Sequence, residues 1–146
     1  MLSYLDIIEA INGSIKSVFP DIEIQSNDIK EGFSRPSFFV DFENIKASKL
    51  NMMYKNTNIP VTVYYFPQSA TKNQIENLSI QSELENAFLE PLLVCNTFYL
   101  STSEVESQIT DGVLQIQFEL EYYEEIEADQ TVEVMDELNI ELRKEG

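Results

Sequence analysis

The chain has 146 residues, 43% of them hydrophobic, and a net charge of −17 at pH 7. This length suits a single domain with its own core, and the apolar content argues against a disordered chain. The charge is uneven: residues 1–72 hold seven basic and eight acidic side chains, whereas residues 73–146 hold two and 18. Such an acidic surface disfavours binding to nucleic acid or to an anionic membrane. We therefore expect one soluble domain spanning residues 1–146.

The N-terminal sequence MLSYLDIIEA lacks the basic region of a signal peptide, and no apolar run reaches the roughly 18 residues of a membrane helix. The single cysteine, Cys95, cannot form a disulfide within the chain, which is typical of a protein that stays in a reducing cytosol. No basic residue lies near it in the sequence to stabilise a thiolate. We therefore expect a small buried hydrophobe, not a reactive thiol.

The first predicted element is an amphipathic helix over residues 3–18. Ser3 is a suitable N-cap, with Asp6 three residues later, and Pro20 ends the helix. Its apolar residues recur every three or four positions and form one stripe: Leu5, Ile8, Ile11, Ile15 and Val18. The sequence DIEIQS at 21–26 then alternates with a period of two, which predicts a short strand.

A second strand begins at Pro36, which lacks an N–H and forces Arg35 into an extended conformation. From there apolar residues occupy one face, and a mostly polar set, Phe39, Asp41 and Glu43, occupies the other. The return strand, 58–67, is bracketed by Pro60 and Pro67, which predicts a position at the edge of the sheet.

Residues 46–56, KASKLNMMYKN, lie between these two strands and predict an extended hairpin arm. A connection this long is usually functional or mobile. One interpretation is a docking surface whose methionines adapt to a partner; the other is an ordinary mobile hairpin tip. The candidate interface residues are Lys46, Lys49, Leu50, Met52, Met53, Tyr54 and Lys55.

The second half of the chain predicts another helix followed by strands. Thr71 and Gln74 form a capping box, and Pro91 stops the helix near Glu90. Its predicted apolar side consists of Ile75, Leu78, Leu84, Phe88 and Leu89. Asp111-Gly112 predicts a tight hairpin, and its second strand, 113–125, alternates apolar residues with polar ones that include Glu119 and Glu121. A last strand is predicted at 137–143.

Two helices, each followed by strands, predict an α+β domain: an antiparallel β-sheet with two main helices packed on one face. Enzyme signatures are few. The chain has no histidine and no phosphate-binding glycine loop, and its acidic half lacks the basic residues that a metal-dependent nuclease needs to hold its substrate. We therefore expect no catalytic residue, no metal site and no cofactor.

The segments EGFSRPSFFV (31–40), NMMYKNTNIPVTVYYFP (51–67) and DGVLQIQFELEYY (111–123), together with the opening helix and strand, resemble the small phage tail terminator proteins of Gram-positive prophages and phage-tail-like bacteriocins. The resemblance covers roughly residues 1–126. Its motifs R-P-x-F-F and Y-F-P are architectural, so no binding residue is carried over.

The resemblance implies a virion tail protein that is assembled in the host cytoplasm as a ring, expected to be a hexamer, on the head-proximal end of the tail tube. Its implied partners are other copies of itself, the tail tube protein, a neck or connector protein and, in a contractile tail, the sheath. We expect DNA to pass through without specific binding. Asp41, Glu43, Glu119 and Glu121 then face the channel or the neighbouring ring, or are merely solvated. Two alternatives stay open: a neck or head–tail connector protein, and an acidic cytosolic adaptor that mimics DNA.

Overall fold

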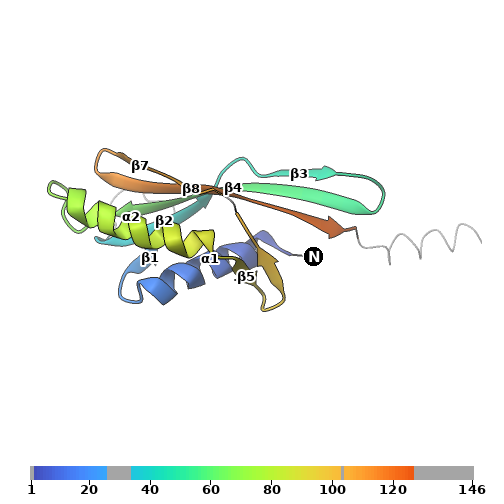
Figure 1. Cartoon of the computed structure of the whole chain (residues 1–146), viewed down its shortest axis with the longest axis horizontal. Helices are drawn as coiled ribbons and strands as arrows, with labels where there is room; N and C mark the ends of the chain where they lie inside the picture. The colour runs from blue at the N-terminus through green and yellow to red at the C-terminus, as the bar shows by residue number, and fades with distance from the viewer. Residues whose placement is uncertain (1, 26–33, 103, 127–146) are drawn as a thin grey trace, which may run out of the picture.

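The computed structural model describes residues 2–25, 34–102 and 104–126, which form two helices and eight strands (Figure 1). In chain order these are α1 (Tyr4–Val18), β1 (Glu23–Gln25), β2 (Ser37–Phe42), β3 (Lys46–Lys49), β4 (Tyr54–Phe66), α2 (Gln74–Leu89), β5 (Leu92–Val94), β6 (Phe98–Leu100), β7 (Glu106–Thr110) and β8 (Val113–Glu125). The fold class is the predicted one, α+β. The strand predicted at 137–143 lies outside the described residues.

Six strands form the main sheet in the order β1-β2-β4-β8-β7, with β3 also paired to β4. Every pairing in it is antiparallel except that of β1 with β2, so the sheet is mixed but predominantly antiparallel. Strands β4 and β8 pair over twelve residues and form the long axis of the molecule. The β7–β8 turn has positive φ at Asp111 (53°) and Gly112 (80°), which confirms the tight hairpin predicted from that dipeptide.

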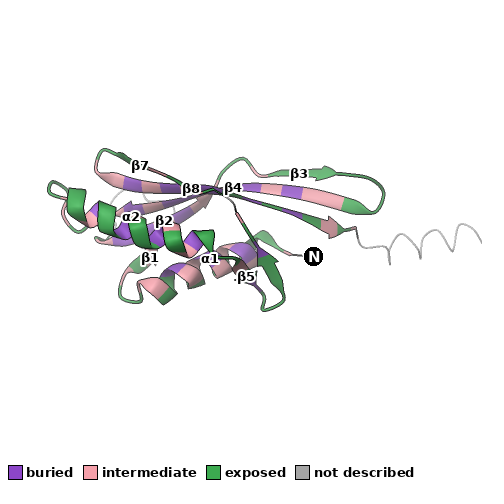
Figure 2. Ribbon diagram, viewed as in Figure 1, coloured by how far each residue is buried: buried purple, intermediate pink, exposed green. Residues whose placement is uncertain are grey.

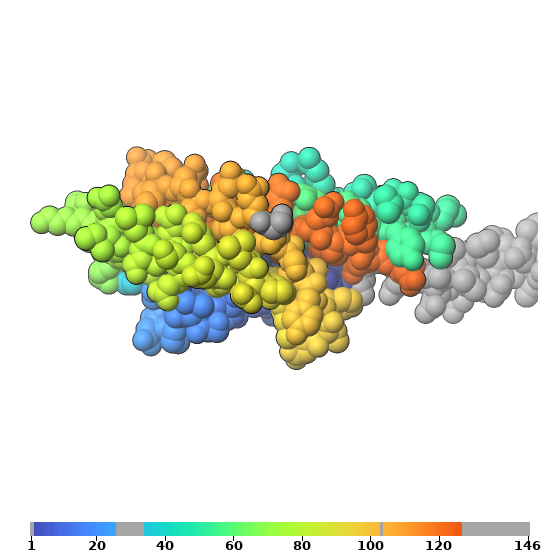
Figure 3. Space-filling model, viewed as in Figure 1, coloured from blue at the N-terminus to red at the C-terminus, as the bar shows by residue number. Residues whose placement is uncertain are grey.

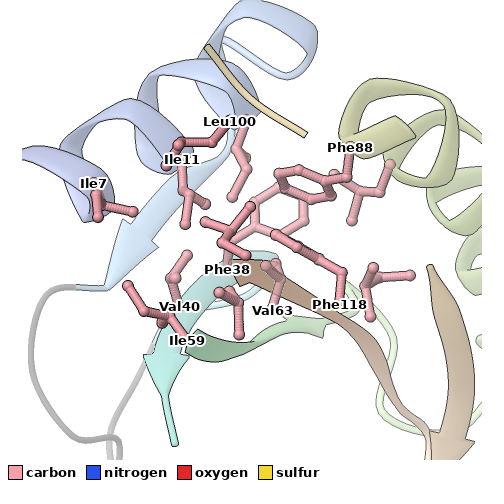
Figure 4. Close-up of a cluster of buried hydrophobic side chains, with 14 of the residues drawn as sticks. Ile7, Ile11, Phe38, Val40, Ile59, Val63, Phe88, Leu100 and Phe118 are labelled. Carbon is pink, nitrogen blue, oxygen red and sulfur yellow. The ribbon is translucent and has the colours of Figure 1, made fainter. Parts of the chain in front are cut away.

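Both helices cover the same face of the sheet, which we call the inner face; the opposite face is the outer face. Alternate residues of the long strands are buried on the inner face, so the predicted apolar side of 113–125 is confirmed (Figure 2). These strand residues pack against Ile7, Ile11 and Ile15 of α1 and against Leu84 and Phe88 of α2. Figure 4 shows the centre of this core, where Phe38, Phe88 and Phe118 converge, and the rings of Phe88 and Phe118 stack at 4.6 Å.

Helix α1 begins as predicted. Ser3 Oγ accepts the Asp6 N–H at 3.1 Å, and the Asp6 carboxylate accepts the Ser3 N–H at 3.3 Å, a reciprocal capping pair that also lowers the pKa of Asp6. The buried stripe consists of Ile7, Ile11 and Ile15. Ile11 and Ile15 are therefore buried as predicted, whereas Leu5 is 74% exposed and Ile7 takes the inward position instead.

The predicted capping box of α2 is wrong. The N-cap is Asn73 and makes no side-chain cap bond. Thr71 lies instead in a turn organised by Ser69, whose hydroxyl accepts the N–H groups of Thr71 and Lys72. The apolar side is also rotated, since the buried residues are Asn77, Ile80, Leu84 and Phe88, while Ile75, Leu78 and Leu89 are exposed. Asn77 faces inward because its Nδ2 donates to Gly112 O at 3.0 Å, which joins α2 to the β7–β8 turn.

Strand β4 lies in the interior of the sheet, so the edge position predicted from its prolines is wrong. The Pro60 carbonyl accepts the Glu43 N–H at 2.9 Å, on the side of β2 and β3. A strand residue directs its N–H and C=O to the same side, so the donor that Pro60 lacks would also face this side. Because β2 ends at Phe42 and β3 begins at Lys46, the missing donor falls at a break between two partner strands.

Strands β5 and β6 form a separate hairpin, which was not predicted from the sequence and projects from the molecule beside the end of α2 (Figure 3). Cys95 lies in its turn with φ of 55° and is exposed, so the prediction of a buried cysteine is wrong. Desolvation and the nearby carboxylates of Asp6 and Glu9 raise the pKa of its thiol. The thiolate, which is the nucleophile, is therefore disfavoured.

Candidate functional site

A three-stranded arm extends beyond the helices at one end of the sheet (Figure 1). It consists of residues 46–59, which contain β3 and the first half of β4, and residues 119–125, which are the last part of β8. The predicted hairpin arm 46–56 is therefore two strands of a broader ribbon, whose third strand comes from the far end of the chain. This third strand brings the acidic Glu119, Glu121, Glu124 and Glu125 beside the lysine-bearing hairpin.

The tip of the arm is an ordered turn with an apolar surface. Asn51 Oδ1 accepts the N–H groups of Met53 and Tyr54 at 2.8 and 3.0 Å, and the Tyr54 carbonyl accepts the Leu50 N–H at 2.9 Å. Met52 is 80% exposed, and Leu50 and Met53 are each exposed by about three-fifths. The structure thus brings the predicted apolar contact residues together at one point.

The lysines of the arm lie on both faces of the ribbon. Cross-strand register places Lys46 opposite Asn58 on the outer face, and Asn58 is opposite Glu121. Lys49 is opposite Lys55 on the inner face, and Lys55 is opposite Glu124. The arm therefore has a basic strand at one margin, β3, and an acidic strand at the other, β8.

An acidic cleft of about 720 Å³ lies on the outer face, next to the arm. Five carboxylates line it: Glu43, Glu104, Glu106, Glu119 and Glu121. Three of the four predicted acidic residues thus share one site; Asp41 lies on the same face beside Thr62 but is not among the lining residues. No lysine or arginine of the described ranges lines the cleft.

Neutral donors hold the cleft carboxylates in place. Thr62 Oγ1 donates to Glu43 Oε2 at 2.8 Å, and the Nδ2 atoms of Asn58 and Asn56 donate to Glu119 and Glu121, each at 3.2 Å. Burial, together with the charges of Glu43 and Asp41, raises the pKa of Tyr64 on the same face. Amide and hydroxyl donors leave the negative charges uncompensated, so this surface repels phosphate and attracts basic groups. In the described part of the chain no group of acidic or thiol side chains is placed to hold a metal ion.

Glu104 and Glu106 were not predicted from the sequence as site residues. They follow the unpredicted β5–β6 hairpin, at the start of β7, where the burial pattern is almost entirely exposed and gives no periodicity to read. Glu106 is opposite Gln117 on β8, and only this pairing brings the two acids to the rim of the cleft.

The two motifs on which the resemblance depends meet in space. Ser37 of R-P-x-F-F is paired with Phe66 of Y-F-P, and the Arg35 guanidinium donates to the Pro67 carbonyl at 3.0 Å. The outer-face rings of Phe39, Tyr64 and Phe66 stack beside this junction. The motifs therefore close one end of the β2–β4 pair and have an architectural role.

None of the helices that the structure describes is long and apolar enough to cross a membrane. No curated protein is a match for the chain. The family described as phage tail terminator protein matches residues 6–132, which is most of the sequence and includes the arm, the cleft and both motifs. The chain therefore belongs to the phage tail terminator family and is a structural protein of the phage tail.

Proposed function

We propose that the protein forms a ring on the head-proximal end of the tail tube, where it ends tube growth and offers a surface to the neck. The single observation that carries this proposal is the family match over residues 6–132. Six subunits are the number that the resemblance implies. The neck protein and, in a contractile tail, the last sheath ring would then bind the surface that faces away from the tube.

The arm is the part of the subunit that suits contact with a neighbouring subunit or with the tube. Leu50, Met52 and Met53 expose large apolar side chains at one point, and methionine adapts its shape to a partner surface. An ordered tip of this kind is already arranged for docking, because Asn51 fixes its backbone. The arm therefore supports a role in assembly better than a role as a merely solvated hairpin.

The acidic cleft suits a surface past which DNA moves. Glu43, Glu119 and Glu121 present charge without a basic counterpart in the cleft, and Asp41 adds to the same face. Carboxylates turned toward the channel would repel the phosphate backbone and prevent adhesion. The same acids would also serve at the contact with the neighbouring ring if that ring is basic.

The test is to delete the gene for this protein and to measure tail length by negative-stain electron microscopy. We expect tubes of abnormal and broadly distributed length, with uniform length restored by the wild-type gene. Tubes of uniform, normal length without the protein would contradict termination. If such tubes also fail to join heads, the protein acts as a neck connector instead.

A matched pair of variants tests the arm. Replacing Leu50, Met52 and Met53 by serine should reduce incorporation of the protein into tails, measured by quantitative immunoblotting of purified particles. Replacing Ile75 and Leu78 by serine is the control, since both are exposed apolar residues of α2 that lie away from the arm. Equal incorporation of the two variants would argue against a docking role for the tip.

A further inference from the structure

We propose that neighbouring subunits join by strand addition, in which β3 of one copy extends the sheet of the next copy along its β8 edge. The two strands run parallel, with Lys46 beside Glu121 and Lys49 beside Glu124 of the neighbour. This inference rests on the proposed ring. It names the contact that closes that ring.

Neither margin of the arm is paired with a further strand among the described residues. Strand β7 pairs only with Val113–Gln117 of β8, and across the described ranges no strand pairs with the far side of β8 from Phe118 to Glu125. Strand β3 likewise pairs only with β4 in the part of the chain that is described. An open strand margin presents a row of unpaired N–H and C=O groups, which another strand can bind.

The backbone hydrogen bonds fix which residues face these margins. The Ile126 N–H donates to Met53 O at 2.7 Å, so even-numbered residues of β8 bond to β4, whereas Glu119, Glu121 and Tyr123 direct their backbone groups outward. The Leu50 N–H donates to Tyr54 O, so Lys46 and Ser48 bond to β4. Ala47 and Lys49 of β3 therefore direct their backbone groups to the free margin.

Symmetry fixes the direction of the joining strands. Strands β3 and β8 are both antiparallel to β4, so they run in the same direction within one subunit. Rotation about a ring axis preserves the sense of a strand along that axis. The neighbour's β3 would therefore lie parallel to β8.

The alternation of side chains agrees with a parallel joint. In a parallel pair, each residue has a lateral neighbour on the partner strand, and the two side chains lie on the same face of the sheet. A residue whose backbone groups face the partner strand does not bond to this neighbour itself. It bonds to the residues immediately before and after the neighbour. Glu121 faces the margin with its side chain on the outer face, and its lateral neighbour would be Lys46 or Ser48, also outer-face residues. The outer faces of adjacent subunits would thus form one continuous surface.

Charge then selects the register. Lys46 and Lys49 are three residues apart, one on each face, as are Glu121 and Glu124. One register puts both lysines beside glutamates. A shift of two residues in either direction puts Lys49 beside Tyr122 or Ile126 instead.

A disulfide experiment on assembled tails tests the joint. The variant carries Cys95→Ser, Ser48→Cys and Tyr123→Cys and is the only copy in the producing cell. Within one chain, Ser48 on β3 and Tyr123 on β8 are both paired with Asn56 on β4, which lies between them. Their Cα atoms are therefore two strand spacings apart, roughly 9.6 Å. This exceeds the reach of a disulfide, about 7 Å between Cα atoms, so any bond between the two positions joins two copies.

We expect oxidised tails to give a ladder of covalent oligomers on non-reducing gels, up to the size of the ring. The control pair, Ser48→Cys with Glu119→Cys, is four residues out of register, about 13 Å along the strand, and should give no ladder. Subunits that run as monomers on the gel, or that form a ladder only in the control variant, would overturn the proposed β3–β8 contact while leaving the proposed ring intact. Uniform tails from which the protein is absent would overturn the proposed function itself.

A charge exchange gives an independent readout. Lys46→Glu and Glu121→Lys should each lower the amount of protein in tail-bound rings by about fivefold or more, because the repulsive pair recurs at every subunit contact. The double variant should restore it. Lys72→Glu is the control, since it makes the same charge change beside α2. A double variant no better than the poorer single variant would overturn the pairing.

Discussion

Two glycines predict opposite effects of the same substitution, and the structure supplies the magnitude of each. Gly112 has φ of +80°, and an added Cβ would lie 2.8 Å from Asn73 Nδ2. Gly13 lies within α1 and has nothing within 4 Å of such a Cβ. Replacement by alanine should therefore destabilise the protein at Gly112 and stabilise it at Gly13.

For Gly112→Ala, the left-handed backbone costs about 1–2 kcal/mol. The Asn73 amide must also move, which weakens its bond to Ser69 O at 3.3 Å and adds about 0.5–1.5 kcal/mol. The total, about 1.5–3.5 kcal/mol, corresponds to a decrease in Tm of about 3–14 °C for a chain of this size. Gly13→Ala should add about 1 kcal/mol of helix stability and raise Tm by about 2–4 °C.

Thermal unfolding followed by circular dichroism, with urea titration as a second measure, decides between these expectations. The single variants serve as controls for each other, since both add one methyl group. A Gly112→Ala protein with unchanged Tm, or two variants that shift Tm in the same direction, would refute the account of the β7–β8 turn.

Three further predictions concern the core and the titrating groups. Phe118→Ala should lower the free energy of unfolding in urea by about 3–5 kcal/mol, because Phe118 is buried against Phe88; a loss below 1 kcal/mol would contradict that packing. Burial raises the pKa of Tyr122 to about 12, so the contribution of the neutral phenol to stability is complete below pH 10 and is lost as the pH rises toward 12. Tyr122→Phe should therefore remove this part of the alkaline decline in Tm. An unchanged decline would contradict the role of Tyr122. Cys95 should react with iodoacetamide at pH 8 more slowly than a free cysteine peptide, and Asp6→Asn should accelerate the reaction; equal rates would exclude an effect of that carboxylate.

Local signals in the sequence predicted those parts of the fold that local interactions determine. The capping pair of Ser3 and Asp6, the alternation along β8 and the Asp111-Gly112 turn each depend on residues within a few positions of one another. They could therefore be predicted without knowing what lies on the other side of the sheet.

The wrong predictions concern residues whose positions depend on a segment far away in the sequence. Pro60 is tolerated in an inner strand only because β2 and β3 leave a break opposite it. Asn77 takes an inward position on α2 because a carbonyl 35 residues later accepts its amide. Cys95 lies in an apolar run yet occupies a turn, and no signal of alternation marks the short strands around it.

The candidate site shows the same division. Composition predicted a lysine-rich hairpin and an acidic second half, but not that β8 completes the ribbon beside the hairpin. That arrangement depends on the pairing of Tyr54 with Glu125 and of the residues that follow, across about 70 positions of sequence. Individual acidic residues could therefore be proposed from the sequence, whereas the cleft that they form together could not.

Strand β8 leads from the Asp111-Gly112 turn at one end to the apolar tip of residues 50–53 at the other, a span of about 40 Å. In any cyclic assembly equivalent atoms stand at equal height, so all the tips would share one rim and all the tight turns the other. The assembly would then be polar along its axis, with an apolar rim formed by the tips and a hydrophilic rim formed by the tight turns. A ring with two different rims can bind one partner on its lower side and a different partner on its upper side, although it is built from a single kind of subunit.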